Sequence, residues 1–268
     1  MPILTVLYIF SLIIIGILVG LCSGLFGVGG GFLMVPLQFF LLTSNNINPD
    51  IALIISFATS LAIIIPTSIT SAYKHNKELN NILKPGLLLG LFGIIGGLLG
   101  GFLAVRTPTK ILQIIFGILL IIIAVKMFTD KNMKNNSKKH ELNIILEAII
   151  GIFVGIFSGL LGVGGGVIII PILSVFIGYS LIESIGISSI FISLTAIGGM
   201  SSYIISGFNI SPLPYSLGYV NLIHFIGIAL FSIPFAYIGA YLSHKIPINL
   251  IQKIFSILII LMAIKMLF

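Results

Sequence analysis

The chain has 268 residues, of which 58% are hydrophobic and only 7% are charged, and its mean hydropathy is +1.28. A soluble domain carries roughly 25% charged residues because its surface faces water, so this composition excludes a soluble globular protein. The formal net charge of +7 does not indicate nucleic-acid binding, since most lysines lie between apolar runs, where positive charge orients a membrane protein. Cys22 is the single cysteine, so no internal disulfide is expected.

Apolar runs long enough to cross a bilayer as helices, about 20 residues each, predict an all-α polytopic membrane protein with about eight transmembrane helices. The expected spans are 3–43, 49–73, 83–105, 109–129, 143–178, 181–206, 217–243 and 247–268. The first and fifth are longer than one crossing requires, so each is expected to break into a full helix and a shorter piece. The first run is also too long for a cleaved signal peptide.

Lysine and arginine residues predict the orientation, because they concentrate in loops on the cytoplasmic side. The loops at 74–84 and 130–142 are rich in lysine and are therefore expected inside. With eight crossings, both chain termini would then face the cytoplasm of a cell membrane. Arg106, Lys110 and Lys245 would lie outside.

The chain contains an internal duplication. Residues 20–36 (GLCSGLFGVGGGFLMVP) and 155–171 (GIFSGLLGVGGGVIIIP) are identical at 10 of 17 positions, and residues 100–127 and 239–266 at 12 of 28. In transporters with duplicated halves, the substrate site typically lies between the repeats near the bilayer midplane, on discontinuous helices.

The duplication divides the chain into a first transmembrane repeat at 1–129, a hydrophilic basic linker loop at 130–142 and a second transmembrane repeat at 143–268. Four spans per half would make the repeats parallel. A broken segment that enters and leaves on the same side would change this count, and the sequence leaves both arrangements open.

Each repeat carries a GVGGG cluster inside its first apolar run. Each glycine in a helix interior costs about 1 kcal/mol relative to alanine, so a helix break is expected here. A short helix that restarts after the break would direct free N–H groups and its positive dipole end at a cavity, which attracts anions. The candidate substrate-binding glycines are Gly29, Gly30, Gly31, Gly164, Gly165 and Gly166. The rival interpretation is that glycines only permit close helix packing, which suits the wider spacing of Gly16, Gly20, Gly24, Gly27, Gly151, Gly155, Gly159 and Gly162.

Hydroxyl side chains are frequent in the second span of each half. A hydroxyl can donate to an oxyanion without the full cost of burying a charge, although serine and threonine also bond within and between helices. Alignment on the pattern pairs Thr59 and Ser60 with Ser188 and Ser189, and these four complete the candidate site.

His224 lies well inside a predicted span, with Asn221 one turn before it. A histidine within a membrane is a functional hypothesis by default, and its ordinary pKa would suit a proton-coupled step. It has no counterpart in the first half, where Pro85 occupies the comparable position.

The paired GLFGVGGG and GLLGVGGG segments, each with a proline five residues on, and the SFATSL segment that follows the first, resemble the sulfite exporter TauE/SafE family, also called the 4-toluene sulfonate uptake permeases. The resemblance spans the whole chain. It implies a multi-pass carrier of the cytoplasmic membrane for sulfite, sulfonates, sulfoacetate, thiosulfate or related anions. By position, it implies the same glycines and hydroxyls as substrate residues. The second half departs from the family's GTSL or ATSL pattern, since it reads ISSI around Ser188 and Ser189.

These observations predict a secondary transporter of small sulfur-containing anions that works by alternating access, with coupling to protons as one option. An anion channel is the nearest alternative, and an intramembrane enzyme or a non-transporting scaffold are alternatives of other classes. The sequence contains no Walker, HExxH or GxSxG motif, so we expect neither ATP hydrolysis nor an enzyme. No cofactor or metal is expected, and the expected partners are the anion and the lipid bilayer.

Overall fold

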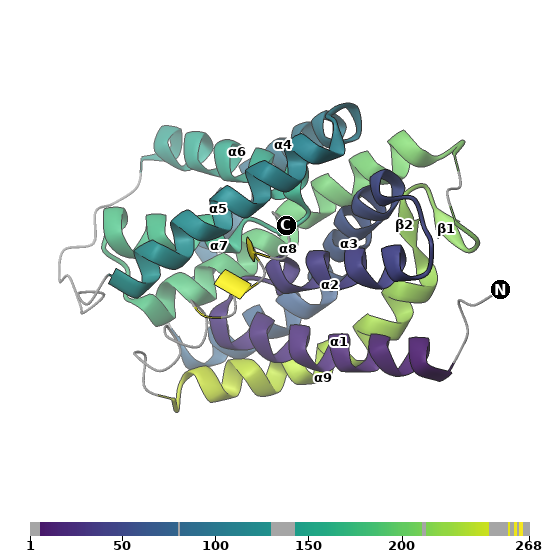
Figure 1. Ribbon diagram of the computed structural model, residues 1–268. Helices are drawn as coiled ribbons and strands as arrows, with labels where there is room; N and C mark the ends of the chain where they lie inside the picture. The colour runs from purple at the N-terminus through teal and green to yellow at the C-terminus, as the bar shows by residue number, and fades with distance from the viewer. Residues whose placement is uncertain are drawn as a thin grey trace.

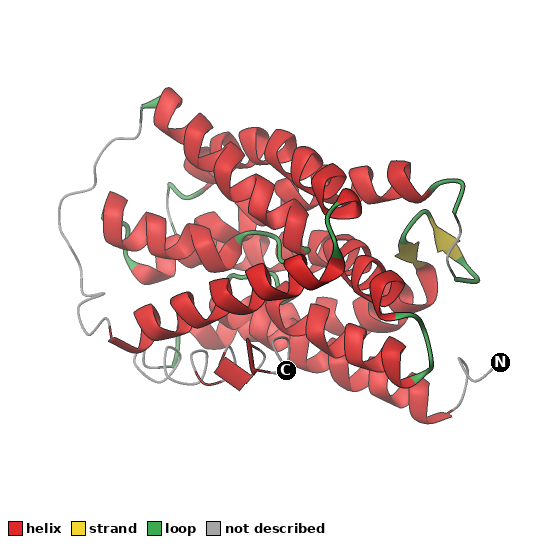
Figure 2. Ribbon diagram, turned by 45° about the horizontal axis from the view of Figure 1, so that its top comes forward, coloured by secondary structure: helices red, strands yellow, loops and turns green. Residues whose placement is uncertain are grey.

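The computed structural model describes residues 6–79, 81–129, 143–210 and 213–246, together with the isolated positions 257, 260, 261, 263 and 264. Its helices are α1 (Val6–Phe26), α2 (Gly31–Ser44), α3 (Pro49–Glu78), α4 (Leu83–Arg106), α5 (Thr109–Thr129), α6 (Ile144–Leu161), α7 (Gly166–Pro171), α8 (Leu181–Gly207) and α9 (Leu222–Ser243). The π-helical segment η2 (Ile172–Ile177) continues α7, and strands β1 (Ser216–Leu217) and β2 (Val220–Asn221) form a small hairpin before α9. Figure 2 shows that helices make up nearly all of the described chain.

Six helices in the described part of the chain are long and apolar enough to cross a membrane, namely α1, α3, α4, α6, α8 and α9. The predicted all-α, multi-pass membrane architecture is therefore confirmed. The expected span at 217–243 begins only at Leu222, because the β1–β2 hairpin occupies its first residues. The expected linker at 130–142 and most of the expected span at 247–268 lie outside the described residues.

The long run at 3–43 forms a helical hairpin. Helix α1 ends at Phe26, and Gly27, Gly29 and Gly30 adopt φ values of 63°, 75° and 75°, in the left-handed region that glycine enters at no steric cost. The chain then turns back, since a Cβ on Gly30 would lie 2.8 Å from the carbonyl oxygen of Val19. Helix α2 therefore runs antiparallel to α1.

The run at 143–178 repeats this hairpin in the second half. Gly162, Gly164 and Gly165 have φ values of 66°, 83° and 80°. A Cβ on Gly165 would lie 2.9 Å from Cγ1 of Val154 on α6. The segment α7–η2 consequently returns along α6, as α2 returns along α1.

Helix α1 packs in parallel against α9, and α4 packs in parallel against α6 (Figure 1). Small residues bring the backbones into contact. The contacting pairs are Gly16 with Ile228, Gly20 with Ser232, and Gly24 with Ala236 between α1 and α9, and Leu89 with Gly151, Gly93 with Gly155, and Gly97 with Gly159 between α4 and α6. The first long helix of each half thus lies against a helix of the other half.

Corresponding helices of the two halves run in opposite directions. Helix α3 ends beside the end of α1, where Nε2 of His75 lies 3.3 Å from the carbonyl oxygen of Gly24. Helix α4 returns from that end, and α6 runs parallel to α4, so α6 is antiparallel to α1. The parallel arrangement that four spans per half would produce is therefore not what forms, because each glycine cluster adds a return segment to its half.

The centrally placed α3 and α8 supply much of the core, and the outer helices expose large apolar side chains. Phe10, Leu91, Phe153 and Leu230 are between 54% and 65% exposed. Such faces are costly in water and suit contact with lipid acyl chains. The arrangement places α3, α8 and the two hairpin bends in the interior.

Candidate functional site

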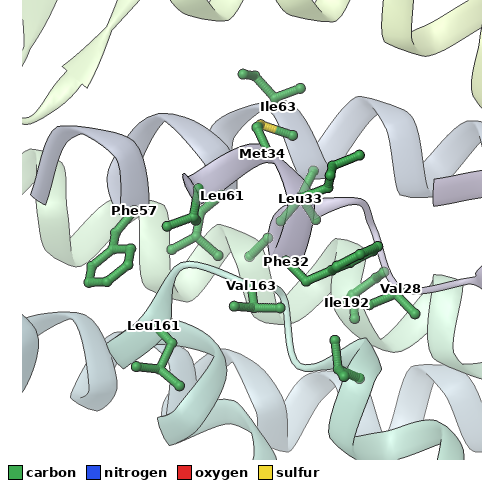
Figure 3. Close-up of a cluster of buried hydrophobic side chains, with 14 of the residues drawn as sticks. Val28, Phe32, Leu33, Met34, Phe57, Leu61, Ile63, Leu161, Val163 and Ile192 are labelled. Atoms are coloured by element: carbon green, nitrogen blue, oxygen red, sulfur yellow. The ribbon is translucent and has the colours of Figure 1, made fainter. Parts of the chain in front are cut away.

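The hairpin bends of the two halves meet inside the molecule. We call Gly27–Gly30 the first glycine loop and Gly162–Gly165 the second glycine loop. A Cβ on Gly31 would lie 2.7 Å from Cα of Val163, and a Cβ on Gly166 would lie 2.5 Å from Cα of Val28. Figure 3 shows Val28 and Val163 in the buried cluster around these loops. The structure therefore brings together the candidate glycines of both halves.

Two isoleucines close over the glycine loops. A Cβ on Gly29 would lie 2.9 Å from Cδ1 of Ile192 and 3.1 Å from Cγ2 of Ile64. A Cβ on Gly164 would lie 3.3 Å from Cδ1 of the same Ile64. Both isoleucines are fully buried. One side chain from α3 and one from α8 thus cover the loops in this conformation.

Serines from the opposite half bind the carbonyl groups that the glycine loops release. Ser60 on α3 donates its hydroxyl hydrogen to the carbonyl oxygen of Gly162. Ser188 on α8 donates to the carbonyl oxygen of Gly27 at 2.7 Å. A broken helix inside a membrane needs such partners, because water does not reach its free backbone groups.

These reciprocal hydrogen bonds correct the alignment of the two halves. Ser60 corresponds in structure to Ser188, so the pairing of Thr59 and Ser60 with Ser188 and Ser189 is wrong by one residue. Thr59 instead accepts a hydrogen bond of 3.0 Å from the backbone N–H of Asn221. Ser189 donates to the carbonyl of Ile185 and lies 3.1 Å from the hydroxyl of Ser71. Two of the four candidate hydroxyls therefore lie at the loops, and the other two bond elsewhere.

Two further hydroxyls at the loops are absent from the candidates that the sequence suggests. Ser23 and Ser158 lie one helical turn before the first and second glycine loop, at matching positions of the duplicated segment. They are 1% and 0% exposed, and neither hydroxyl has a hydrogen-bond partner among the described residues. The identical serine in LCSG and IFSG was the available signal.

His224 lies apart from the glycine loops, at the first turn of α9. Its ring bonds the hydroxyl of Tyr8, and its Nδ1 lies 3.1 Å from Oε1 of Gln38. Its backbone N–H donates to the capping side chain of Asn221. Asn221 in turn donates to Thr59, so a chain of hydrogen bonds links the histidine to α3 beside Ser60.

His224, Tyr8 and Asn221 also line a small cavity with about 40 Å³ of space for water centres, enough for a few water molecules. The cavity extends to Asn45 and Tyr215 at the molecular edge. Among the described residues, no three histidine, cysteine or acidic side chains come together as ligands for a metal ion.

The family model described as "Sulfite exporter TauE/SafE" matches residues 12–266. The chain belongs to the sulfite exporter TauE/SafE family. It is 34% identical to a "Probable membrane transporter protein" of Haemophilus influenzae over 97% of this chain and 98% of the relative. It is also 34% identical to "Probable membrane transporter protein MJ0441" of Methanocaldococcus jannaschii, over 91% of this chain and 86% of the relative.

Membership in the TauE/SafE family confirms the resemblance that the glycine motifs indicate, and the chain is a membrane transporter. A "Probable membrane transporter protein YunE" of Bacillus subtilis is 24% identical over 96% of each chain. No solved structure gives a significant match.

Proposed function

We propose that this TauE/SafE protein is a secondary transporter that binds a small sulfur-containing anion between its two glycine loops. The substrate class is sulfite, sulfonates, sulfoacetate or thiosulfate. The observation that supports this site is the direct contact of two helix breaks, one from each oppositely directed half. The proposed substrate residues are Gly29, Gly30, Gly31, Thr59, Ser60, Gly164, Gly165, Gly166, Ser188 and Ser189.

Neutral groups would bind the anion at this site. Helix α2 starts beside the contact, and its N-cap residue is Gly30, which has no side chain that could cap the first N–H groups. The N-terminal N–H groups of a helix and its positive dipole end favour an anion. The described lysines and arginine are Lys74, Lys77, Lys84, Arg106, Lys110, Lys126 and Lys245, all close to the ends of helices or beyond them.

Alternating access follows from the opposite directions of the two halves. When two similar halves are inverted, exchanging their conformations turns a site that opens to one side into one that opens to the other. Ile64 on α3 and Ile192 on α8 contact both Gly29 and Gly164. We expect these two side chains to move away from the loops on opposite sides in the two open states.

Proton coupling would act through His224. The histidine bonds Tyr8 and Gln38, borders the cavity, and connects through Asn221 to Thr59. Because Nδ1 faces the acceptor oxygen of Gln38, protonation of the ring would add a donor at Nε2, where the Tyr8 hydroxyl now supplies one. The hydrogen-bonded chain beside Ser60 would then rearrange.

The proposed orientation in the cell membrane reverses the earlier expectation for the N-terminus. Lys74 and Lys77 at the end of α3, Lys84 at the start of α4 and Lys245 beyond α9 share one end of the molecule, which we call the lysine end. His75 and His244 contact each other there at 3.1 Å. Positive charge favours the cytoplasmic side. Because α1 runs toward the lysine end, its beginning would face the outside.

Flux into liposomes tests this function. Purified protein is reconstituted, and uptake of sulfite, thiosulfate, sulfoacetate, methanesulfonate and chloride is measured with and without a pH gradient. A transporter gives saturable, uphill uptake of a sulfur anion, and a channel gives flux that only follows the gradient. The Gly30→Leu and Gly165→Leu variants should insert into membranes but lose uptake. Wild-type flux in both variants would reject the glycine-loop site.

A further inference from the structure

Ser23 and Ser158 differ from most other buried serines of the long helices. A helical serine in an apolar environment usually donates to the carbonyl three or four residues earlier, as Ser56 does to Ala52 at 2.7 Å. Leaving a buried hydroxyl without a partner costs about 1–3 kcal/mol. Neither Ser23 nor Ser158 has a hydrogen-bond partner within the described part of the chain.

Ser23 and Ser158 occupy equivalent positions of the duplicated segment. Ser184 also lacks a partner there, but Ser56, its equivalent at the spacing that relates Ser60 to Ser188, is bonded. Ser23 and Ser158, in contrast, both lack a hydrogen-bond partner among the described residues, one in each half. A packing accident in one half does not account for a matched pair.

Both hydroxyls belong to the helix face that contacts the glycine loop. A Cβ on Gly165 would lie 3.2 Å from Cβ of Ser158 and 2.9 Å from Cγ1 of Val154, one turn earlier. In the first half, a Cβ on Gly30 would lie 2.6 Å from Cγ1 of Val19, one turn before Ser23. Ser158 is therefore next to Gly165, and Ser23 holds the matching position in the first half, one turn beyond the Val19 that contacts Gly30.

We propose that Ser23 and Ser158 donate hydrogen bonds to the oxygen atoms of a singly charged oxyanion held at the glycine loops. This inference rests on the proposed function and specifies its site. Ser60 and Ser188 donate their hydroxyl hydrogens to loop carbonyls, whereas the hydroxyl hydrogens of Ser23 and Ser158 are available to the substrate. An anion oxygen is the acceptor that both buried donors require.

The charge of the substrate follows from the chemistry of the donors. Hydroxyl and backbone N–H groups carry no formal charge, and the desolvation cost of an ion rises steeply with its charge. A site of neutral donors therefore favours a monoanion with several oxygens, such as a sulfonate or hydrogen sulfite. Dianions such as sulfate, thiosulfate and sulfoacetate bind more weakly there, so this inference narrows the substrate class proposed above.

The test measures the dissociation constant of methanesulfonate, a monoanion, and of sulfate, a dianion, by calorimetry on detergent-purified protein at pH 7. The proteins are the wild type, Ser23→Ala, Ser158→Ala and the double variant. The matched control is Ser243→Ala, which removes a buried serine that donates to Ala240 at 2.8 Å near the end of α9. The melting temperature without anion is recorded for each protein.

Each loop-serine variant should bind methanesulfonate about ten- to a hundredfold more weakly than the wild type, the effect of losing a hydrogen bond to a charged group. Its melting temperature without anion should stay the same or rise, because an unpartnered hydroxyl is removed. Ser243→Ala should keep wild-type affinity, and the wild type should bind sulfate at least about tenfold more weakly than methanesulfonate.

Three results overturn the inference in distinguishable ways. Wild-type affinity in both single variants removes the serines from the site but leaves the proposed function standing. Equal affinity for sulfate and methanesulfonate overturns the preference for a monoanion. A wild-type protein that neither binds nor transports any sulfur anion overturns the serine site and the proposed function together.

Discussion

Gly31 of the first half packs against Val163 of the second, with the position of a Cβ on Gly31 only 2.7 Å from the valine Cα. Backbone atoms fill the space where a side chain would lie, so neither loop can shift locally to accommodate one. The joint between the halves depends on this contact and on its counterpart between Gly166 and Val28.

Gly31→Ala should therefore lower stability by about 1–3 kcal/mol, the usual cost of forcing extra atoms into a packed core. Transport should fall with it. Gly227→Ala is the matched control, since its new methyl would meet the flexible end of the Leu12 side chain at 3.0 Å rather than backbone atoms. Thermal unfolding in detergent measures the stability of both variants. Equal melting temperatures for the two variants would contradict a rigid contact between the loops.

Ser188→Ala removes the donor to the carbonyl of Gly27. A buried carbonyl without its partner costs about 1–3 kcal/mol, and the loss should be accompanied by faster hydrogen exchange in the first glycine loop. Ser193→Ala is a suitable comparison, because that serine bonds only the carbonyl of Ile190 in its own helix. If amide hydrogens of the first glycine loop exchange at the same rate in both variants, Ser188 does not stabilise the loop of the opposite half.

His224→Gln should preserve binding but abolish the response of uptake to a pH gradient. Glutamine can still bond Tyr8 or Gln38, yet it cannot take up a proton near neutral pH. Uptake in liposomes with and without an imposed gradient checks this, with Tyr8→Phe as a second variant that leaves the ring free to titrate. A gradient response that persists in His224→Gln would place proton coupling elsewhere or exclude it.

Impermeant maleimide labelling tests the orientation. In a Cys22→Ala background, Ser44→Cys at the end of α2 and Asn76→Cys at the lysine end introduce exposed thiols on opposite sides. We expect intact cells to label only Ser44→Cys, and permeabilised cells to label both. Labelling of Asn76→Cys alone in intact cells would reverse the assignment.

Mild acid should destabilise the lysine end. Partial desolvation beside His75 lowers the pKa of His244 below its ordinary value of 6.5; Lys74 lowers this pKa further, whereas Glu78 raises it. The unfolded chain consequently binds this proton more readily, so stability falls as the pH drops through about 6.5. His244→Gln should flatten the melting-temperature profile below that pH, and Lys110→Gln should not. An unchanged slope in His244→Gln would exclude His244 as the cause.

Much of the membrane architecture was predictable, because length and hydropathy decide which segments can cross lipid. The resemblance to the TauE/SafE family was predictable from the glycine motifs and is confirmed by the family match. The reversal of the chain direction at Gly30 was not predictable from the sequence, since a left-handed glycine can continue, kink or reverse a helix. Contact with Val19 selects the reversal. The direction of the second half depends on that choice.

The hydroxyl candidates show a second limit of the sequence. SFATSL and SIGISSI do not reveal that Ser60 and Ser188 are the ones that bind loop carbonyls, because hydrogen-bond partners more than 100 residues away decide it. For the same reason, Ser23 and Ser158 look like ordinary small packing residues until their surroundings are known. The roles of these four hydroxyls in substrate binding stay predictions.

The pairing of α1 with α9 has a consequence for how the protein is made. Gly24 contacts Ala236, so α1 meets this partner only after more than 200 further residues have been synthesised. Until then its glycine face must be shielded by lipid or by insertion factors. Truncated chains that stall before α9 should therefore be recognised by membrane quality control.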